Sequence, residues 1–346
     1  MKVVLAYKNF AASKNISHIG LGVAALNTSK CLIREGIPVQ VWPIVNSAQL
    51  VSELRKRTDV THVVISAPWI PSLEIQNMIM EFPDVMFAVS CHSNVGFLQA
   101  DSNGVKLVRE AMEIERASHN FHLAGNSCKF SEWIQRAYSV PCAYLPNLYY
   151  LDEHVNAHRP MFSGGILRIG VFGATRPLKN FMSACGAALE IAQQLKVETE
   201  VWLSAGRAEG GGEVVLRAAR EMMRNLPHIR LIENSWQTWP QFRTTVAHMH
   251  LLLQPSYTES FNMVTADGVA AGVPSVVSDA IDWAPPAWTA RADDVVEIAR
   301  IGRTLLNDAE APSDGLKALN HHNKAGIRAW KSYLGAPAGP CYNWRE

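Results

Sequence analysis

Two acidic residues, Glu259 and Asp267, lie around a loop that leaves an apolar strand and enters a helix. The helical pattern stops at Gly272, before Pro274, as expected of a glycine that ends a helix and a proline that cannot continue it. The unpaired N–H groups and partial positive charge of a helix start favour phosphate or another anion. Glu259 precedes this start and Asp267 lies about two turns inside it. We therefore expect both carboxylates to accept hydrogen bonds from sugar hydroxyls beside an anion.

Three further side chains lie at a predicted helix start or strand end, where a binding or catalytic role is expected. Lys179 lies beside Asn180 at a predicted helix start, where a cation opposes the helix dipole unless an anion is bound. Arg176 precedes Lys179 in the same loop and either joins it or is a surface residue. His92 ends a predicted strand, where it is either a satisfied core histidine or a functional group.

A glycine pair, Gly20 and Gly22, loosely fits a dinucleotide-binding pattern but lies too far beyond the first strand for the tight turn of that motif. We interpret it as a glycine-hinged loop and helix start that contacts the acceptor together with His18, although a structural role fits equally. The pair His248 and His250 has metal-compatible spacing but no acidic or cysteine partner, so no metal site is predicted.

The elements that must position these residues alternate between short apolar runs and longer amphipathic stretches, which predicts parallel sheets covered on both faces. Strands are expected at residues 3–7, 39–44, 61–66, 85–90, 121–124 and 142–145, and again at 167–172, 199–204, 229–232, 251–254 and 275–278. Helices are expected at residues 21–35, 48–57, 73–82, 105–118, 130–138, 181–195, 212–226, 239–248, 262–271 and 313–333.

The pattern divides the chain into an α/β domain over residues 1–150, a polar linker over 151–165 and a second α/β domain over 166–312. A C-terminal helical segment and tail follow at 313–346. Ligands of doubly wound sheets bind outside the carboxyl ends of the strands, so we expect the site in a cleft between the two domains.

The amino-acid composition excludes several classes of protein. The 346 residues are 48% hydrophobic and 18% charged, which is typical of a globular protein and excludes a disordered or fibrous one. A net charge of +1 gives no support for a dedicated nucleic-acid binder. The six cysteines are scattered and are expected to be reduced thiols. No apolar run is long enough for a signal peptide core or a membrane span, so we expect a cytoplasmic protein without an integral membrane segment.

The Glu259-to-Asp267 segment resembles the acidic-x7-acidic signature of the family 4 retaining glycosyltransferases, which adopt the two-domain GT-B fold. Other stretches resemble motifs of the same family and follow in the same order. They are Val89 to His92, Asn126-Ser127, Leu145-Pro146-Asn147, Gly173 to Asn180, and Ala271 to Pro274 with Ser278-Asp279.

The resemblance implies a donor that is a nucleoside-diphosphate sugar, no cofactor and no required metal. Glu259 would hold donor-sugar hydroxyls and His92 would lie beside that sugar, both as catalytic residues. Asp267 would hold the ribose. The diphosphate would face two cations and the amides at the helix start, namely Arg176, Lys179, Phe261, Asn262, Met263 and Val264. The reaction would retain the anomeric configuration, with a donor phosphate oxygen helping to deprotonate the acceptor.

The chain departs from the family pattern at three places. Asp267 replaces the usual glutamate, Ala174 stands where the family commonly has an arginine, and residues 279–283 replace a glycine pair. These departures put the ribose contact, the diphosphate contact and the donor selectivity in question.

Two alternatives stay open. One is a viral-type DNA glycosyltransferase that acts on hydroxymethylated bases through a basic rim at Arg291, Arg300, Arg303, Lys317, Lys324, Arg328 and Lys331. The other is a non-catalytic module that only binds sugar nucleotides. The acceptor is a glycan, a small molecule or modified DNA, and the sequence does not distinguish them.

Overall fold

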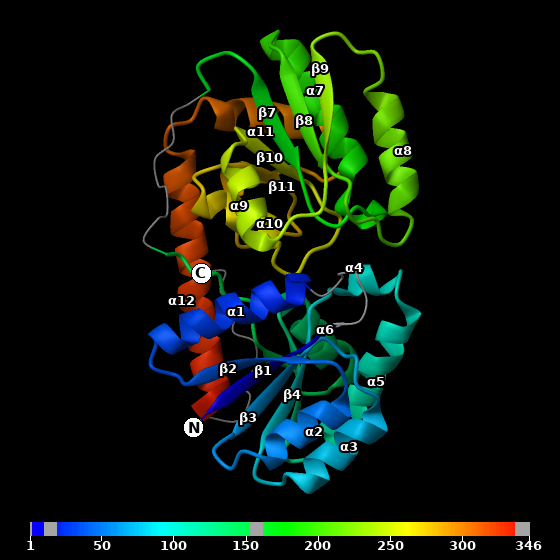
Figure 1. Cartoon of the computed structure of the whole chain (residues 1–346), viewed down its shortest axis with the longest axis vertical. Helices are drawn as coiled ribbons and strands as arrows, with labels where there is room; N and C mark the ends of the chain where they lie inside the picture. The colour runs from blue at the N-terminus through cyan, green and yellow to red at the C-terminus, as the bar shows by residue number, and fades with distance from the viewer. Residues whose placement is uncertain (1, 10–18, 153–161, 336–346) are drawn as a thin grey trace. The chain divides into compact units, whose positions relative to one another are not determined.

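The computed structural model describes residues 2–9, 19–152 and 162–335 (Figure 1). The chain separates into two compact units. Unit 1 takes the residues up to Tyr150 and those from His322 onward, and unit 2 takes Leu151–His321. Most of the predicted linker, residues 153–161, lies outside the described residues.

Unit 1 is built on a parallel sheet with the strand order β2-β1-β3-β4-β5-β6. Its strands are β1 (Val3–Lys8), β2 (Val39–Ile44), β3 (His62–Ser66), β4 (Met86–Cys91), β5 (Phe121–Gly125) and β6 (Ala143–Tyr144). Its helices are α1 (Ile19–Arg34), α2 (Ser47–Arg55), α3 (Ser72–Glu81), α4 (Val95–Leu98), α5 (Ser102–Ala117) and α6 (Cys128–Tyr138).

Alternation along the strands sends neighbouring side chains to opposite faces of this sheet. In β1, Val4 and Ala6 join a core cluster with residues of α2, α3, α5 and α6. Val3 and Leu5 join a second cluster with residues of α1 and the C-terminal helix. Both faces of the sheet are therefore buried, which is why its strands are almost continuously apolar.

Unit 2 has the strand order β11-β10-β7-β8-β9, again with parallel neighbours. Its strands are β7 (Leu167–Val171), β8 (Thr199–Ser204), β9 (Ile229–Asn234), β10 (Leu251–Gln254) and β11 (Ser275–Val277). Its helical elements are η1 (Pro177–Lys179), α7 (Phe181–Leu195), α8 (Gly212–Met222), α9 (Trp239–Ala247), α10 (Met263–Ala270), η2 (Pro286–Trp288) and α11 (Val295–Leu306). The strand order reverses between β7 and β10, so their carboxyl ends form a topological switch point.

The predicted α/β class, with two doubly wound parallel sheets, is confirmed. The sequence pattern did not predict α11, although Ile298, Ile301 and Leu305 are buried on one side of it. The suggested basic rim includes two residues of this helix, Arg300 and Arg303, and Arg291, which precedes it. α11 packs against α7, β10 and β11.

The last helix, α12 (Ala311–Gly335), crosses the division between the units at His322. The sequence pattern predicts a separate C-terminal segment at residues 313–346. In the structure, the residues of α12 from His322 onward belong to unit 1. Trp330 is 3% exposed and its Nε1 donates to the Pro146 carbonyl at 2.9 Å. Asn323 donates to the Tyr149 carbonyl at 2.8 Å and accepts from the Tyr149 N–H at 3.0 Å.

Candidate functional site

The switch point of unit 2 gathers residues from two loops that are far apart in the sequence. The loop after β7 leads through η1 to Lys179 and Asn180, and the loop after β10 leads through Glu259 to Asn262. Because β7 and β10 are neighbours, both loops emerge at the same edge of the sheet. The Tyr257 N–H donates to the Leu178 carbonyl at 3.0 Å and joins the two loops directly.

Lys179 and Glu259 form a buried ion pair at this edge. Their side chains are 11% and 8% exposed, and the Lys179 ammonium donates to Glu259 Oε1. The same oxygen accepts from Ser256 Oγ at 2.8 Å and from Asn262 Nδ2 at 3.0 Å. This carboxylate oxygen is thus held by an ammonium, a hydroxyl and an amide, which fixes its orientation.

The pKa values of the pair follow from burial and mutual attraction. Burial lowers the pKa of the Lys179 ammonium, and Glu259 opposes that shift. Burial by itself raises the pKa of Glu259, but the charge and hydrogen bond of Lys179, together with Arg176 and Ser256, outweigh it, so this pKa lies below its ordinary value. Glu259 is therefore a carboxylate at neutral pH and acts as a hydrogen-bond acceptor.

Two asparagines in the left-handed backbone region shape the loops. Asn180 has φ 56° where η1 meets α7, and its Nδ2 donates to the Pro255 carbonyl at 2.9 Å. Asn262 has φ 68° and caps α10, because its Oδ1 accepts from the Thr265 N–H at 2.9 Å. Asparagine tolerates this conformation better than most residues and can cap a helix at the same time.

The predicted diphosphate residues at the start of α10 have different surroundings. Phe261 is 2% exposed and stacks on Trp283, with ring centroids 5.4 Å apart. Asn262 already accepts from the Thr265 and Ala266 N–H groups. A ligand at this helix start could therefore use the N–H groups of Met263 and Val264, whereas the Phe261 side chain belongs to the core.

Asp267 lies inside α10 and is 2% exposed. Its Oδ1 accepts from the indole N–H of Trp239, the first residue of α9, at 3.0 Å. The proposed ribose contact of Asp267 stays a prediction, and the structure adds Trp239 as the residue that orients its carboxylate.

The loop after β8 supplies charged residues that sequence reasoning missed. Arg207 and Glu209 form an ion pair there, and Glu209 Oε2 also lies 3.5 Å from Arg176 Nη1. β8 is the other neighbour of β7, so its loop emerges at the same edge. A sheet order assumed from the α/β alternation could have pointed to this loop, since β7 and β8 are consecutive strands.

His92 belongs to unit 1, where it follows β4. Its Nδ1 lies 3.3 Å from Nδ2 of Asn126, which follows the neighbouring strand β5. Burial lowers the pKa of His92 to about 4, so the imidazole is neutral at physiological pH.

The glycine pair lies in the first turn of α1, which begins at Ile19. A Cβ at Gly22 would meet the Tyr7 ring at 3.0 Å, so this glycine allows α1 to pack against β1. A Cβ at Gly20 would meet nothing within 4 Å. His18 lies outside the described residues.

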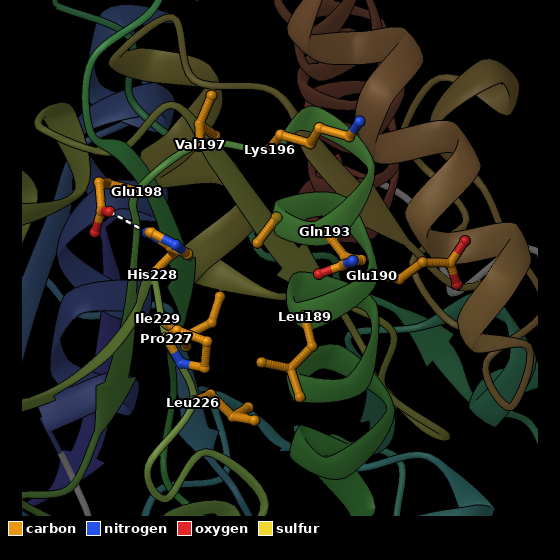
Figure 2. Close-up of a pocket in the computed structure, with 11 residues that line it drawn as sticks. Leu189, Glu190, Gln193, Lys196, Val197, Glu198, Leu226, Pro227, His228 and Ile229 are labelled. Carbon is orange, nitrogen blue, oxygen red and sulfur yellow. Dashed lines mark hydrogen bonds and ion pairs between the residues drawn. The ribbon is translucent and has the colours of Figure 1, made fainter.

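A separate cavity of about 800 Å³ lies at the opposite edge of the unit 2 sheet (Figure 2). Its lining includes Leu189, Lys196 and Pro227, and the ion pair between Glu198 and His228. Glu198 and His228 directly precede β8 and β9, so the cavity borders the amino ends of these strands. It contains none of the predicted site residues.

Metal-ligand clusters and membrane-spanning helices are both absent from the described part of the chain. No group of three or more His, Cys, Asp or Glu side chains there is arranged to hold a metal ion. No helix within those ranges combines the length and hydrophobicity needed to span a membrane.

Comparison with known proteins gives structural matches only, since neither a protein-family model nor a curated protein matches the chain. An α,α-trehalose-phosphate synthase from Burkholderia xenovorans superposes with a TM-score of 0.66 and 10% identity, over 96% of this chain and 99% of its own. The sucrose-phosphate synthase of Thermosynechococcus elongatus gives 0.62 and 12%, over 96% and 98%. S. aureus TarM, solved with UDP, gives 0.61 and 14%, and the chain spans 59% of its length.

The fold is GT-B. The matched proteins share the pair of parallel α/β units with this chain, which agrees with the strand orders described above. At 10–14% identity these matches establish the architecture. A shared fold does not by itself determine activity, which depends on the residues of the site.

Proposed function

We propose that this chain is a retaining glycosyltransferase that moves a sugar from a nucleoside-diphosphate sugar to an acceptor hydroxyl without a catalytic metal. The observation that carries the proposal is the buried Lys179–Glu259 pair at the switch point of unit 2. The names of the matched proteins, which include a UDP-forming synthase and an enzyme solved with UDP, support the donor class.

Each residue of the proposed site has a separate role in the reaction. Lys179 and Arg176 neutralise the diphosphate as it leaves, which stabilises charge that develops in the transition state. Glu259 accepts hydrogen bonds from the donor sugar. As the bond from the anomeric carbon to phosphate oxygen breaks, the acceptor oxygen bonds to that carbon on the same face. The acceptor proton passes to the departing phosphate oxygen. Neutral His92 serves as a hydrogen-bonding group near the sugar.

Substitution of Glu259→Gln tests this assignment, because it keeps the shape of the side chain and removes the charge that orients the donor. Sugar transfer or donor hydrolysis should fall at least about 100-fold. Tyr257→Phe is the matched control, since this exposed side chain lies in the same loop and should leave turnover near the wild-type value. Circular dichroism and thermal unfolding would show that both variants fold. A folded Glu259→Gln protein with wild-type turnover would contradict the site assignment.

The donor base is best identified by thermal shift. UDP, GDP and ADP should be compared with and without attached sugars, because a ligand that binds only the folded state raises the unfolding temperature. Stabilisation by a nucleotide with no turnover of any sugar donor would favour the non-catalytic module instead.

Charge pairing weakens the case for a DNA acceptor. Arg291 forms ion pairs with Asp294 and Glu297. Arg303 Nη1 lies 3.6 Å from Glu190 Oε1, and Lys331 Nζ lies 2.6 Å from Glu35 Oε2. These carboxylates offset much of the proposed basic rim. Absence of DNA retention at low salt would remove this alternative.

A further inference from the structure

The loop after β8 brings a third cation to the diphosphate side of the proposed donor site. Arg207 belongs to this loop, and its guanidinium pairs with Glu209, which also faces Arg176. The side chains of Arg176, Arg207 and Glu209 are 24%, 30% and 27% exposed. A ligand can therefore reach the cluster, and it is not a part of the sealed core.

Backbone hydrogen bonds hold this loop against the loop that carries Arg176. The Thr175 N–H donates to the Arg207 carbonyl at 2.9 Å, and the Glu209 N–H donates to the Thr175 carbonyl at 2.8 Å. The Thr175 hydroxyl donates to the Ser204 carbonyl at the end of β8. Arg207 and Glu209 are thus positioned by main-chain contacts on both sides of Thr175, and their approach to Arg176 does not depend on the ion pairs alone.

The charges of Arg176 and Glu209 also act on the buried Lys179–Glu259 pair. Arg176 and Glu209 both act on the Lys179 ammonium, and Arg176 acts on Glu259. The ion pairs join Arg176 and Arg207 to Glu209, and Lys179 to Glu259. The formal charge of these five side chains taken together is +1. A diphosphate carries more than one negative charge and would form ion pairs with the same cations. Glu209 and Glu259 therefore compete with it for these cations.

We infer that Arg207 is a diphosphate-binding residue and that Glu209 is an internal competitor for the donor phosphates, which sets donor affinity and speeds release of the nucleoside diphosphate. This inference rests on the proposed function and deepens it. When the donor binds, its phosphates replace the Glu209 carboxylate on Arg176 and Arg207. When the product leaves, Glu209 pairs with both guanidinium groups again.

Titration calorimetry with UDP, GDP and ADP tests the inference on the full chain. Glu209→Gln removes the competing charge and keeps the side-chain shape, so the best of these ligands should bind about tenfold more tightly than to the wild type. Arg207→Ala should weaken the same ligand about tenfold, and Arg207→Lys should recover part of the loss. With a sugar donor that is turned over, Glu209→Gln should lower both KM and kcat. A structural role alone would not tighten binding.

Glu221→Gln is the matched control, because Glu221 is an exposed glutamate of α8 that pairs with Arg224 at 2.8 Å. It should bind as the wild type does. If the wild type binds a nucleotide but Glu209→Gln binds no more tightly, or Arg207→Ala binds equally well, the inference is wrong and the proposed function stands. If the wild type binds none of the three nucleotides, the proposed function itself fails and the inference falls with it.

Discussion

Glu259 combines burial with several simultaneous contacts, and this combination makes it sensitive to substitution. Loss of one partner of a buried ion pair leaves the other charge uncompensated and typically costs about 3–5 kcal/mol, more than the pair contributes to stability. Lys179 and Glu259 are therefore better explained by a charged ligand than by fold stability. Under the proposed function, the Lys179 ammonium pairs with Glu259 in the free protein and with a donor phosphate in the complex, so it is paired in both states.

The pH dependence of stability should report on His92. Its pKa of about 4 in the folded chain lies below the ordinary value near 6.5, so the unfolded chain binds the proton first as the pH falls. The contribution of His92 is present above pH 6.5 and is lost as the pH falls towards 4. We expect urea unfolding at pH 7 and pH 4 to show about 3 kcal/mol less acid destabilisation in His92→Gln than in the wild type.

His321→Gln, which changes an exposed histidine of α12, is the matched control for this measurement. Equal acid destabilisation in the His92→Gln and His321→Gln variants would contradict a neutral, half-buried His92 in the folded chain.

At the scale of elements, the start of α8 is fitted closely against the loop after β7. A Cβ at Gly212 would lie 2.0 Å from the Thr175 carbonyl oxygen, a distance that forces the backbone to move. Thr175 is the residue that holds the Arg207 loop in place. The helix start and the charged cluster are therefore coupled through Thr175, and the Gly212 N–H also donates to the Glu209 carbonyl at 2.9 Å.

Gly212→Ala should destabilise the protein by about 1–3 kcal/mol, because α8 must shift away from Thr175. Under the proposed function, it should also weaken binding of whichever nucleoside diphosphate the wild type binds. Thermal unfolding and calorimetry measure the two effects. Gly335→Ala is the matched control, since a Cβ at this exposed glycine of α12 would meet nothing within 4 Å. Wild-type stability in Gly212→Ala would show that the start of α8 has room for a methyl group beside the Thr175 carbonyl.

At the scale of the whole molecule, the core of unit 1 is completed by residues that follow unit 2 in the sequence. Trp330, Tyr333 and Leu334 of α12 join the cluster that covers one face of the unit 1 sheet. Unit 1 is thus discontinuous in the chain, and its folding requires contacts between residues far apart in the sequence. The hydrogen bond from Trp330 to Pro146, for example, joins residues 184 positions apart. Contacts of such long range carry a large loop-closure cost, which the buried apolar surface must offset.

Trp330→Ala should cost about 3–5 kcal/mol, because it removes a large buried side chain and leaves the Pro146 carbonyl without its indole donor. Guanidinium unfolding measures the loss. Lys324→Ala, at an exposed position of the same helix, should unfold as the wild type does. Equal midpoints for the two variants would show that α12 contributes little to unit 1.

Sequence reasoning located most strands within one or two residues because burial on both faces leaves a continuous apolar run that local composition reveals. The strand at Thr199–Ser204 and the helix at Phe181–Leu195 have the predicted bounds. It missed α11, although Ile298, Ile301 and Leu305 have helical spacing and the Asp294 side chain caps the helix start. It missed Arg207 and Glu209 because a charged loop residue has no periodic signal.

By itself the sequence determined the alternation of strands and helices, the α/β class and the candidate residues Lys179, Glu259 and Asp267, since these depend on local composition and spacing. Only the tertiary structure decided that β7 lies between β10 and β8. That order brings Lys179 to Glu259, 80 positions later, and Arg176 to Glu209. Strand order depends on how whole faces bury one another, and such long-range packing leaves no local pattern in the chain.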